Sequence, residues 1–180
     1  MGQQKPLLPL GDKPVIRHCL DALMPAGIRD IVVVVSAQGN GVAAALKGLP
    51  VTIAVNDLAG SDMAESVRTG LRSVEGSPSG ILVCLSDHPL VSPDTVRTII
   101  RQHGETPDSV IIPCYQGKRG HPTLFPLKII NEIFSGVTLR DIVRSHDRGV
   151  RLIDVDNEGV VLDMDTEADY RMIQKKQEGA

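Results

Sequence analysis

The chain of 180 residues contains few aromatic side chains and has no excess of positive charge. Tryptophan is absent, and only two tyrosines and two phenylalanines occur, so the core must be built from aliphatic side chains. The formal net charge is −3, and the basic residues are scattered, with no aromatic rings among them to stack on bases. These two deficits argue against a nucleic acid partner. An aliphatic core suits a parallel sheet covered by helices.

Long apolar runs are missing as well. No stretch approaches the roughly 20 residues that span a bilayer, so we expect no membrane partner. No secretory signal is visible at the start. The three cysteines, Cys19, Cys84 and Cys114, form no C-x-x-C pair, which argues against a zinc site. Cys84 lies inside an apolar run, which indicates a small core residue. We therefore expect a cytoplasmic protein.

The alternation of predicted strands and helices indicates the fold class. Helices are predicted at 14–26, 42–46, from 61 or 62 to 73, 92–103, 127–134, 138–145 and 166–174. Strands are predicted at 31–35, 51–55, 81–85, 110–113, 123–125, 150–155 and 160–162. This order predicts an α/β, Rossmann-like fold: a mostly parallel central sheet flanked by helices, with a small antiparallel addition from the late short strands. We expect a single domain over residues 1–180.

Asp87 is the first candidate site residue. It follows the strand predicted at 81–85, within the segment Ser86-Asp87-His88-Pro89-Leu90. In open α/β sheets, ligands bind beyond the carboxyl ends of the strands. A carboxylate there is well placed to hold Mg²⁺ against the phosphates of a nucleotide. The alternative is an acid that caps the following turn, and position alone does not decide between the two.

Three further segments combine polar side chains with glycine turns or helix starts. Lys5 follows a glycine-containing stretch, and it either contacts phosphate or is a solvated lysine. The segment 56–66 ends a strand and starts a helix, whose amides favour an anion; the alternative is a capped surface helix. Lys118 and Arg119, in the turn 117–122, either bind an anionic acceptor or form a solvated basic turn.

His121 closes the same turn, where it serves equally well to fix the turn or to do chemistry. Asp163 and Asp165 lie between a predicted strand and a predicted helix, and in an extended segment both point to the same face. With Asp87 they would complete a metal site; the alternative is simply the charged start of a helix. A D-x-D motif of a glycosyltransferase is disfavoured, because such motifs lie mid-domain. No Walker loop or G-x-G-x-x-G is present.

Taken in this order, the segments resemble the molybdenum cofactor nucleotidyltransferases, within the nucleotide-diphospho-sugar transferase superfamily, and most closely the cytidylyltransferase branch. Residues 1–5 resemble the end of that family's loop L-A-A-G-x-S-x-R-M-G-x-x-K. Residues 56–71 resemble N-P-x-W-x-x-G-M-x-x-S-L-x-x-G-L, and residues 86–90 resemble G-D-Q-P-L. Residues 120–122 match G-H-P, and residues 163–166 resemble D-I-D-T.

The resemblance implies Mg²⁺-dependent transfer of CMP from CTP to a molybdopterin-type molybdenum cofactor, with release of pyrophosphate. The Lys-Pro-Leu-Leu-Pro-Leu run favours CTP over GTP, and a molybdoenzyme or its chaperone is a further implied partner. The implied site residues are Asp87 and Lys5 as catalytic groups; Asp87, Asp165 and, less strongly, Asp163 as metal ligands; and Lys5, Asn56, Ser66, His121 and Arg119 as nucleotide or acceptor ligands.

The chain also departs from the family pattern. The family's first strand and most of its phosphate-binding loop would precede Met1, so we expect a central strand and part of the triphosphate site to be missing. Leu58 stands near the tryptophan position, and His88 replaces glutamine. Two alternatives therefore stay open. One is a guanylyl- or sugar-phosphate nucleotidyltransferase of the same fold, and the other is a non-catalytic nucleotide- or cofactor-binding relative.

Overall fold

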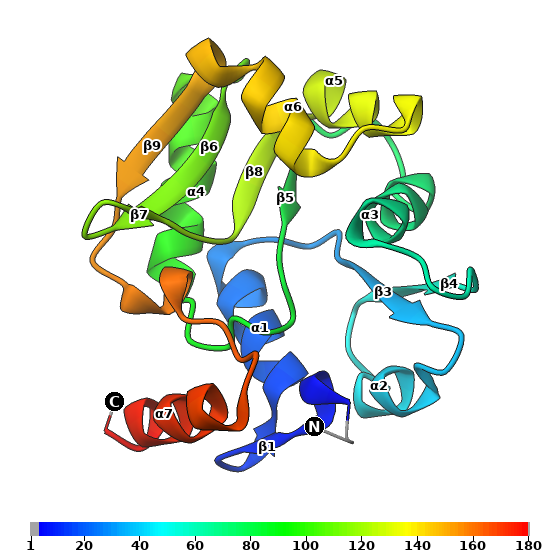
Figure 1. The fold of residues 1–180 in the computed structure, drawn as a ribbon, viewed down its shortest axis with the longest axis vertical. Helices are drawn as coiled ribbons and strands as arrows, with labels where there is room; N and C mark the ends of the chain where they lie inside the picture. Colours follow the sequence, from blue (N-terminus) through cyan, green and yellow to red (C-terminus); the bar gives the residue numbers. More distant parts are fainter. Residues whose placement is uncertain (1–3, 180) are drawn as a thin grey trace.

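The computed structural model describes residues 4–179 and contains helices on both sides of a group of strands (Figure 1). The α-helices are α1 (Val15–Leu23), α2 (Asn40–Ala45), α3 (Met63–Arg72), α4 (Pro93–Glu105), α5 (Leu127–Ile130), α6 (Leu139–Ser145) and α7 (Glu167–Glu178). The strands are β1 (Pro9–Leu10), β2 (Lys13–Pro14), β3 (Val32–Ser36), β4 (Thr52–Asn56), β5 (Gly80–Val83), β6 (Val110–Tyr115), β7 (Lys118–Arg119), β8 (Thr123–Pro126) and β9 (Val150–Asp154). Short 3₁₀ segments are η1 (Lys5–Leu7), η2 (Met24–Ala26), η3 (Asn131–Ser135), η4 (Asp147–Gly149) and η5 (Glu158–Val161).

Side-chain caps start the helices that the sequence predicts most clearly. The Asp62 carboxylate accepts a hydrogen bond from the backbone N–H of Glu65 at 2.8 Å, so α3 begins from Asp62 rather than Ser61. Ser92 caps α4 in the same way, with a proline at the first helical position. Thr166 caps α7 through a reciprocal capping box with Asp169. These caps satisfy backbone N–H groups that have no partner within the helix.

The strands pair in separate groups. β3 and β4 are parallel to each other, whereas β8 lies between β5 and β6 and is antiparallel to both. β9 runs parallel to β6, and β7 forms a hairpin with β6. Within residues 4–179 no pairing joins β3 to β5, so each of these strands keeps one unpaired edge. The α/β class is confirmed, but the strand arrangement is mixed, because antiparallel β8 lies inside it rather than at its margin.

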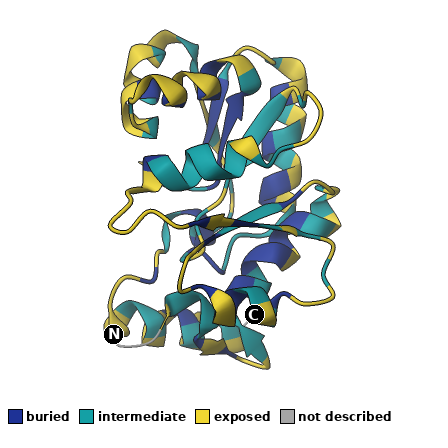
Figure 2. Ribbon diagram, turned by 90° about the vertical axis from the view of Figure 1, so that its right-hand side faces the viewer, coloured by how far each residue is buried: buried dark blue, intermediate teal, exposed yellow. Residues whose placement is uncertain are grey.

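Two helical layers hold the separate strand groups together. Leu82 of β5 packs with the core of α1 and α4, which also contains Val35 of β3. Its neighbours Ile81 and Val83 face the opposite core, which contains α3, α5 and α6. α3 also packs on β3, and Gly70 favours this close approach because a Cβ at that position would lie 3.1 Å from the side chain of Val34. Figure 2 shows the buried segments between these layers.

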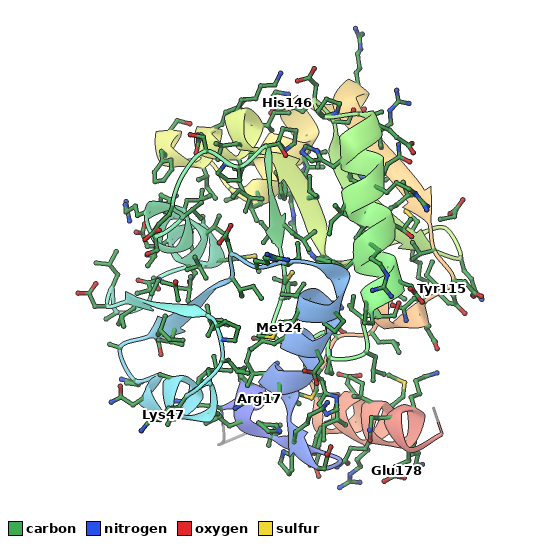
Figure 3. The ribbon with its side chains drawn as sticks, turned by 180° about the vertical axis from the view of Figure 1, so that it is seen from behind. Arg17, Met24, Lys47, Tyr115, His146 and Glu178 are labelled. Atoms are coloured by element: carbon green, nitrogen blue, oxygen red, sulfur yellow. The ribbon has the colours of Figure 1, made fainter. Side chains whose placement is uncertain are left out.

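A third core joins the two ends of the described chain. Leu8, Leu10 and Val15, from the N-terminal hairpin and α1, pack with Met164 and Ile173 at α7. α7, which ends near the labelled Glu178, accordingly lies beside the N-terminal hairpin (Figure 3). The Tyr170 hydroxyl adds a hydrogen bond to the Pro9 carbonyl oxygen. This packing brings residues more than 150 positions apart into contact.

Two expectations from the sequence are wrong. Residues 160–162 do not form a strand, because residues 158–161 form the 3₁₀ segment η5. Gly159 fits tightly there, since a Cβ would lie 2.0 Å from the Leu90 carbonyl oxygen. Cys84 follows β5, which is paired on one edge only, and it is exposed rather than buried.

No helix among residues 4–179 is long and apolar enough to cross a membrane.

Candidate functional site

Lys5 and Asp165 meet at the centre of the candidate site. The Lys5 Nζ atom lies 2.8 Å from the Asp165 Oδ1 atom, and both side chains are partly exposed. The hydrogen bond to Asp165 raises the pKa of Lys5, and the charges of Asp87 and Asp163 raise it further. Three carboxylates therefore act on one ammonium group, Asp165 through a hydrogen bond and Asp87 and Asp163 through their charges. These four residues are the catalytic and metal-binding candidates from the sequence.

The segment before α7 presents both of its carboxylates on one side. Asp163 and Asp165 are exposed, whereas Met164 between them is fully buried in the core that joins the N-terminal hairpin to α7. This alternation is that of an extended segment, as expected from the sequence. The capping box at Thr166 fixes the chain directly after Asp165. The backbone of this segment is therefore held on both sides of Asp165.

Asp87 contributes a carboxylate from the loop after β5. Its Oδ1 atom is buried and has no hydrogen-bond partner within residues 4–179. The nearest cationic or potentially cationic group is the imidazole of His88, whose Nε2 atom lies 3.8 Å away, too far for a hydrogen bond. A buried carboxylate oxygen without a partner is unfavourable, so a bound cation or donor at this position would be stabilising.

His121 and His88 form a second polar cluster beside Asp87. Their ring centroids are 5.2 Å apart, and the Nδ1 atoms of both rings are buried without a hydrogen-bond partner among the described residues. Burial and the neighbouring His88 lower the pKa of His121, although Asp87 and Asp163 oppose the shift. A cavity of about 20 Å³ adjoins both rings and is also lined by Cys19 and Cys84. The sequence identified His121 as a candidate but gave His88 no role.

Two loops around this cluster are held together by Asn157, which the sequence analysis did not identify, and by the close packing of Gly120, which it placed in a turn. Asn157 accepts hydrogen bonds from the Ser92 backbone N–H at 2.9 Å and from the Thr95 hydroxyl at 3.2 Å, and its amide donates to the Leu90 carbonyl oxygen. Gly120 has no room for a side chain, because a Cβ would lie 2.4 Å from the Val160 carbonyl oxygen. The contacts of Asn157 connect distant segments, so no local pattern could have identified this residue.

Asn56 and Ser66 organise the loop between β4 and α3. The Asn56 side-chain amide donates hydrogen bonds to the hydroxyls of Ser61 at 2.9 Å and Ser66 at 3.2 Å. Its carbonyl oxygen accepts a bond from the Leu58 backbone N–H. Asn56 is only 5% exposed, and among residues 4–179 no hydrogen bond joins it to the carboxylates of the Lys5 cluster. In this state Asn56 shapes a loop rather than presenting a free amide to a ligand.

Arg119 has no bonded partner among the other predicted site residues in the described part of the chain. It is exposed on β7, opposite Cys114 in the hairpin. No hydrogen bond or ion pair of the Arg119 side chain occurs within residues 4–179. The structure therefore brings together Lys5, Asp87, Asp163 and Asp165, with His121 adjacent, but it does not bring Asn56, Ser66 or Arg119 into contact with them.

The acidic cluster suits a hard divalent cation. No group of three His, Cys, Asp or Glu side chains within residues 4–179 is already arranged as a metal cage. Mg²⁺ does not require one, because it commonly takes one or two carboxylates, with water and substrate phosphates completing its shell. The carboxylate oxygens of Asp87 and Asp165 match this chemistry. The ammonium group of Lys5 shows that the cluster already attracts a cation.

Comparison with known proteins identifies the family of the chain. The model of the MobA-like NTP transferase domain matches residues 1–150. The chain belongs to this family. Its members are nucleotidyltransferases, and an α/β fold with a mixed sheet flanked by helices is shared with solved relatives.

Several relatives cover most of the chain. The structure of Rv0371c from Mycobacterium tuberculosis in complex with manganese has a TM-score of 0.80 and 28% sequence identity, covering 97% of this chain and 93% of that chain. A nucleotidyl transferase from Methanothermobacter has a TM-score of 0.83 and 23% identity, over 97% and 85% of the two chains, which shows a common fold. Nicotine blue oxidoreductase from Paenarthrobacter nicotinovorans is 27% identical over 94% of this chain and 87% of that protein.

Proposed function

We propose that this NTP transferase domain is a Mg²⁺-dependent cytidylyltransferase that transfers CMP from CTP to a molybdopterin-type cofactor and releases pyrophosphate. The observation that carries the proposal is the ion pair of Lys5 with Asp165, within the electrostatic reach of Asp87 and Asp163. Cationic and acidic groups are both needed to handle a metal–triphosphate complex. The choice of CTP and of this acceptor rests on the family resemblance of the sequence.

The reaction exchanges one phosphorus–oxygen bond for another. A phosphate oxygen of the acceptor attacks the α-phosphorus of CTP, and the bond from that phosphorus to the bridging oxygen breaks as pyrophosphate leaves. In this mechanism Lys5 neutralises charge on the triphosphate as a point charge. Because no covalent enzyme intermediate is required, the protein contributes mainly by positioning and charge neutralisation.

Asp87 and Asp165 are the proposed metal ligands, and Asp163 is an additional candidate. The unpartnered Oδ1 atom of Asp87 and the ammonium held by Asp165 support this assignment. When bound, Mg²⁺ would supply positive charge against the phosphate oxygens. The carboxylates would hold that charge at the end of β5, where ligands of α/β sheets collect.

The remaining proposed ligands lie around this centre. The unpartnered ring nitrogen of His121 suits hydrogen bonding to the acceptor, and the free guanidinium of Arg119 suits an anionic part of it. Asn56 and Ser66 would reach the nucleotide only after giving up hydrogen bonds that now hold their loop. A molybdoenzyme or its chaperone would receive the product in the cytoplasm.

The direct test is pyrophosphate release by the full chain with molybdenum cofactor as acceptor. We expect release with CTP and Mg²⁺, none after chelation of the metal, and at least about tenfold less with GTP. Omitting the acceptor is the control for simple CTP hydrolysis. A preference for GTP would instead identify a guanylyltransferase. Binding of CTP without any pyrophosphate release would identify a non-catalytic relative.

A further inference from the structure

The carboxylates of the candidate metal site already hold a positive charge supplied by the chain itself. Lys5 Nζ lies 2.8 Å from Asp165 Oδ1, in a single hydrogen-bonded ion pair across 160 positions of sequence. Asp87 and Asp163 act on the same ammonium through their charges. An ammonium that is held by Asp165 is not available to a triphosphate at the same time. A metal ion would therefore compete with Lys5 for Asp165, and a triphosphate would compete with Asp165 for Lys5.

The backbones on both sides of this ion pair are anchored, but the lysine side chain is not. The Gln4 side-chain amide donates to the Gln38 carbonyl oxygen at 3.0 Å, and the Leu8 backbone N–H donates to the Lys5 carbonyl oxygen at 3.1 Å. On the other side, buried Met164 and the capped start of α7 hold Asp165. The Lys5 side chain is 36% exposed, so it can leave Asp165 without any change in the fold.

We propose that the Lys5 ammonium is an internal substitute for the divalent cation, and that metal binding releases Lys5 from Asp165 to bind the triphosphate. This inference rests on the proposed function, since it assigns an order of events to the same site. Without metal, the ion pair keeps Lys5 away from nucleotide and keeps Asp165 neutralised. With metal, Asp165 is occupied by the stronger charge and Lys5 becomes free. Metal and nucleotide binding are thereby coupled through one side chain.

The first experiment measures metal affinity without nucleotide. The titrant is Mn²⁺, whose unbound fraction is read from its electron paramagnetic resonance signal. Lys5→Met removes the competing charge, so we expect the affinity for Mn²⁺ to rise about two- to fivefold, the range of a partly exposed ion pair. Lys13→Met is the matched control, because Lys13 on the N-terminal hairpin pairs with Asp21 in the second half of α1, outside the acidic cluster. We expect it to leave Mn²⁺ affinity unchanged.

The second experiment measures CTP binding by calorimetry in the presence of a chelator. Asp165→Asn frees Lys5 and should raise metal-free CTP affinity about threefold or more. Asp163→Asn is the control, because it removes the same charge but leaves the Lys5–Asp165 hydrogen bond intact. We expect a smaller gain for Asp163→Asn. When Lys5→Met is already present, Asp165→Asn should raise metal-free CTP affinity no more than Asp163→Asn does.

The outcomes separate this inference from the proposed function. Unchanged or weaker Mn²⁺ binding by both Lys5→Met and the second variant Lys5→Gln would overturn the coupling, as would equal CTP gains for the two aspartate variants. If the binding results hold but no pyrophosphate is released from any nucleotide, the proposed reaction is wrong and the coupling stands. If the unaltered protein binds no Mn²⁺, both are wrong.

Discussion

Strands β3 and β6 are both almost wholly apolar, but they are buried to different extents. Five of the six residues of β6 are buried, whereas β3, with four consecutive valines, buries only Val35. β6 has neighbours on both edges, and β3 pairs with β4 alone. The comparison shows that burial in this protein follows the number of paired neighbours rather than side-chain hydrophobicity. β5, which is also unpaired on one edge, has no fully buried residue either.

The two strand groups also carry different polar groups. The loop after β5 and the segment before α7 present Asp87 and Asp165, whose charges remain partly available. The end of β4 carries Asn56 and the start of α3 carries Ser66, and the polar atoms of these two side chains bond to each other. Carboxylates that the protein satisfies only in part suit ligand binding, whereas mutually bonded polar groups suit loop stability. The following predictions separate these roles, beginning with the largest effect.

Asp87→Asn should reduce pyrophosphate release about 100-fold or more, because it removes charge directed at the metal–phosphate complex. The free energy of unfolding should change little, since the Asp87 Oδ1 atom has no protein partner to lose. Steady-state kinetics and urea unfolding measure the two quantities. Asp108→Asn, which breaks an exposed ion pair with Lys128, is the control and should leave activity intact. Full activity in Asp87→Asn would contradict its assignment as a metal ligand.

Val110→Ala and Val33→Ala compare equivalent truncations in the two strand groups. Val110 is completely buried in β6, so we expect a loss of about 2–3 kcal/mol from the free energy of unfolding. Val33, half-buried in β3, should lose only about 1 kcal/mol. Chemical unfolding of both variants measures the difference. Equal losses would mean that β3 is covered in solution to the same extent as β6.

Asn56→Ala should destabilise the protein by about 1–2 kcal/mol, because it removes three hydrogen bonds made by a nearly buried side chain. Ser66→Ala removes a single bond from the same network and should cost about 1 kcal/mol. Thermal unfolding measures both losses. If Asn56→Ala instead retained stability and raised the KM for CTP, Asn56 would be a nucleotide ligand and not a loop anchor.

Asp169→Asn should have the smallest effect, and the effect should depend on pH. Hydrogen bonds from the Thr166 hydroxyl and backbone hold the pKa of Asp169 below its usual value. A lowered carboxyl pKa contributes stability above the unfolded value of about 3.9, and this contribution is lost as the pH falls through the folded value. We therefore expect the variant's melting temperature to be lower at pH 7, and the difference from the unaltered protein to shrink as the pH falls below about 3.9. A difference that did not shrink at acidic pH would contradict this origin.

The local elements were largely predictable from the sequence. Caps at Ser92, Thr138 and Thr166 and apolar runs at 32–35 and 110–113 act over a few residues, so a short pattern carries the whole signal. The strand expected at 160–162 failed for a physical reason. Gly159 lies against the Leu90 carbonyl group, and this long-range contact imposes a 3₁₀ segment that no local preference indicates.

The sequence by itself determined which residue types are available for chemistry: a lysine near the start, an aspartate after an apolar run, and a pair of aspartates before a capped helix. Only the tertiary structure decided which of them meet. Lys5 reaches Asp165 because the N-terminal hairpin, α1 and α7 share one core, and Asn56 is withdrawn because Ser61 and Ser66 fold back onto it. The physical reason is range, since capping and periodicity act within a few residues, whereas an ion pair across 160 positions depends on packing of the whole chain.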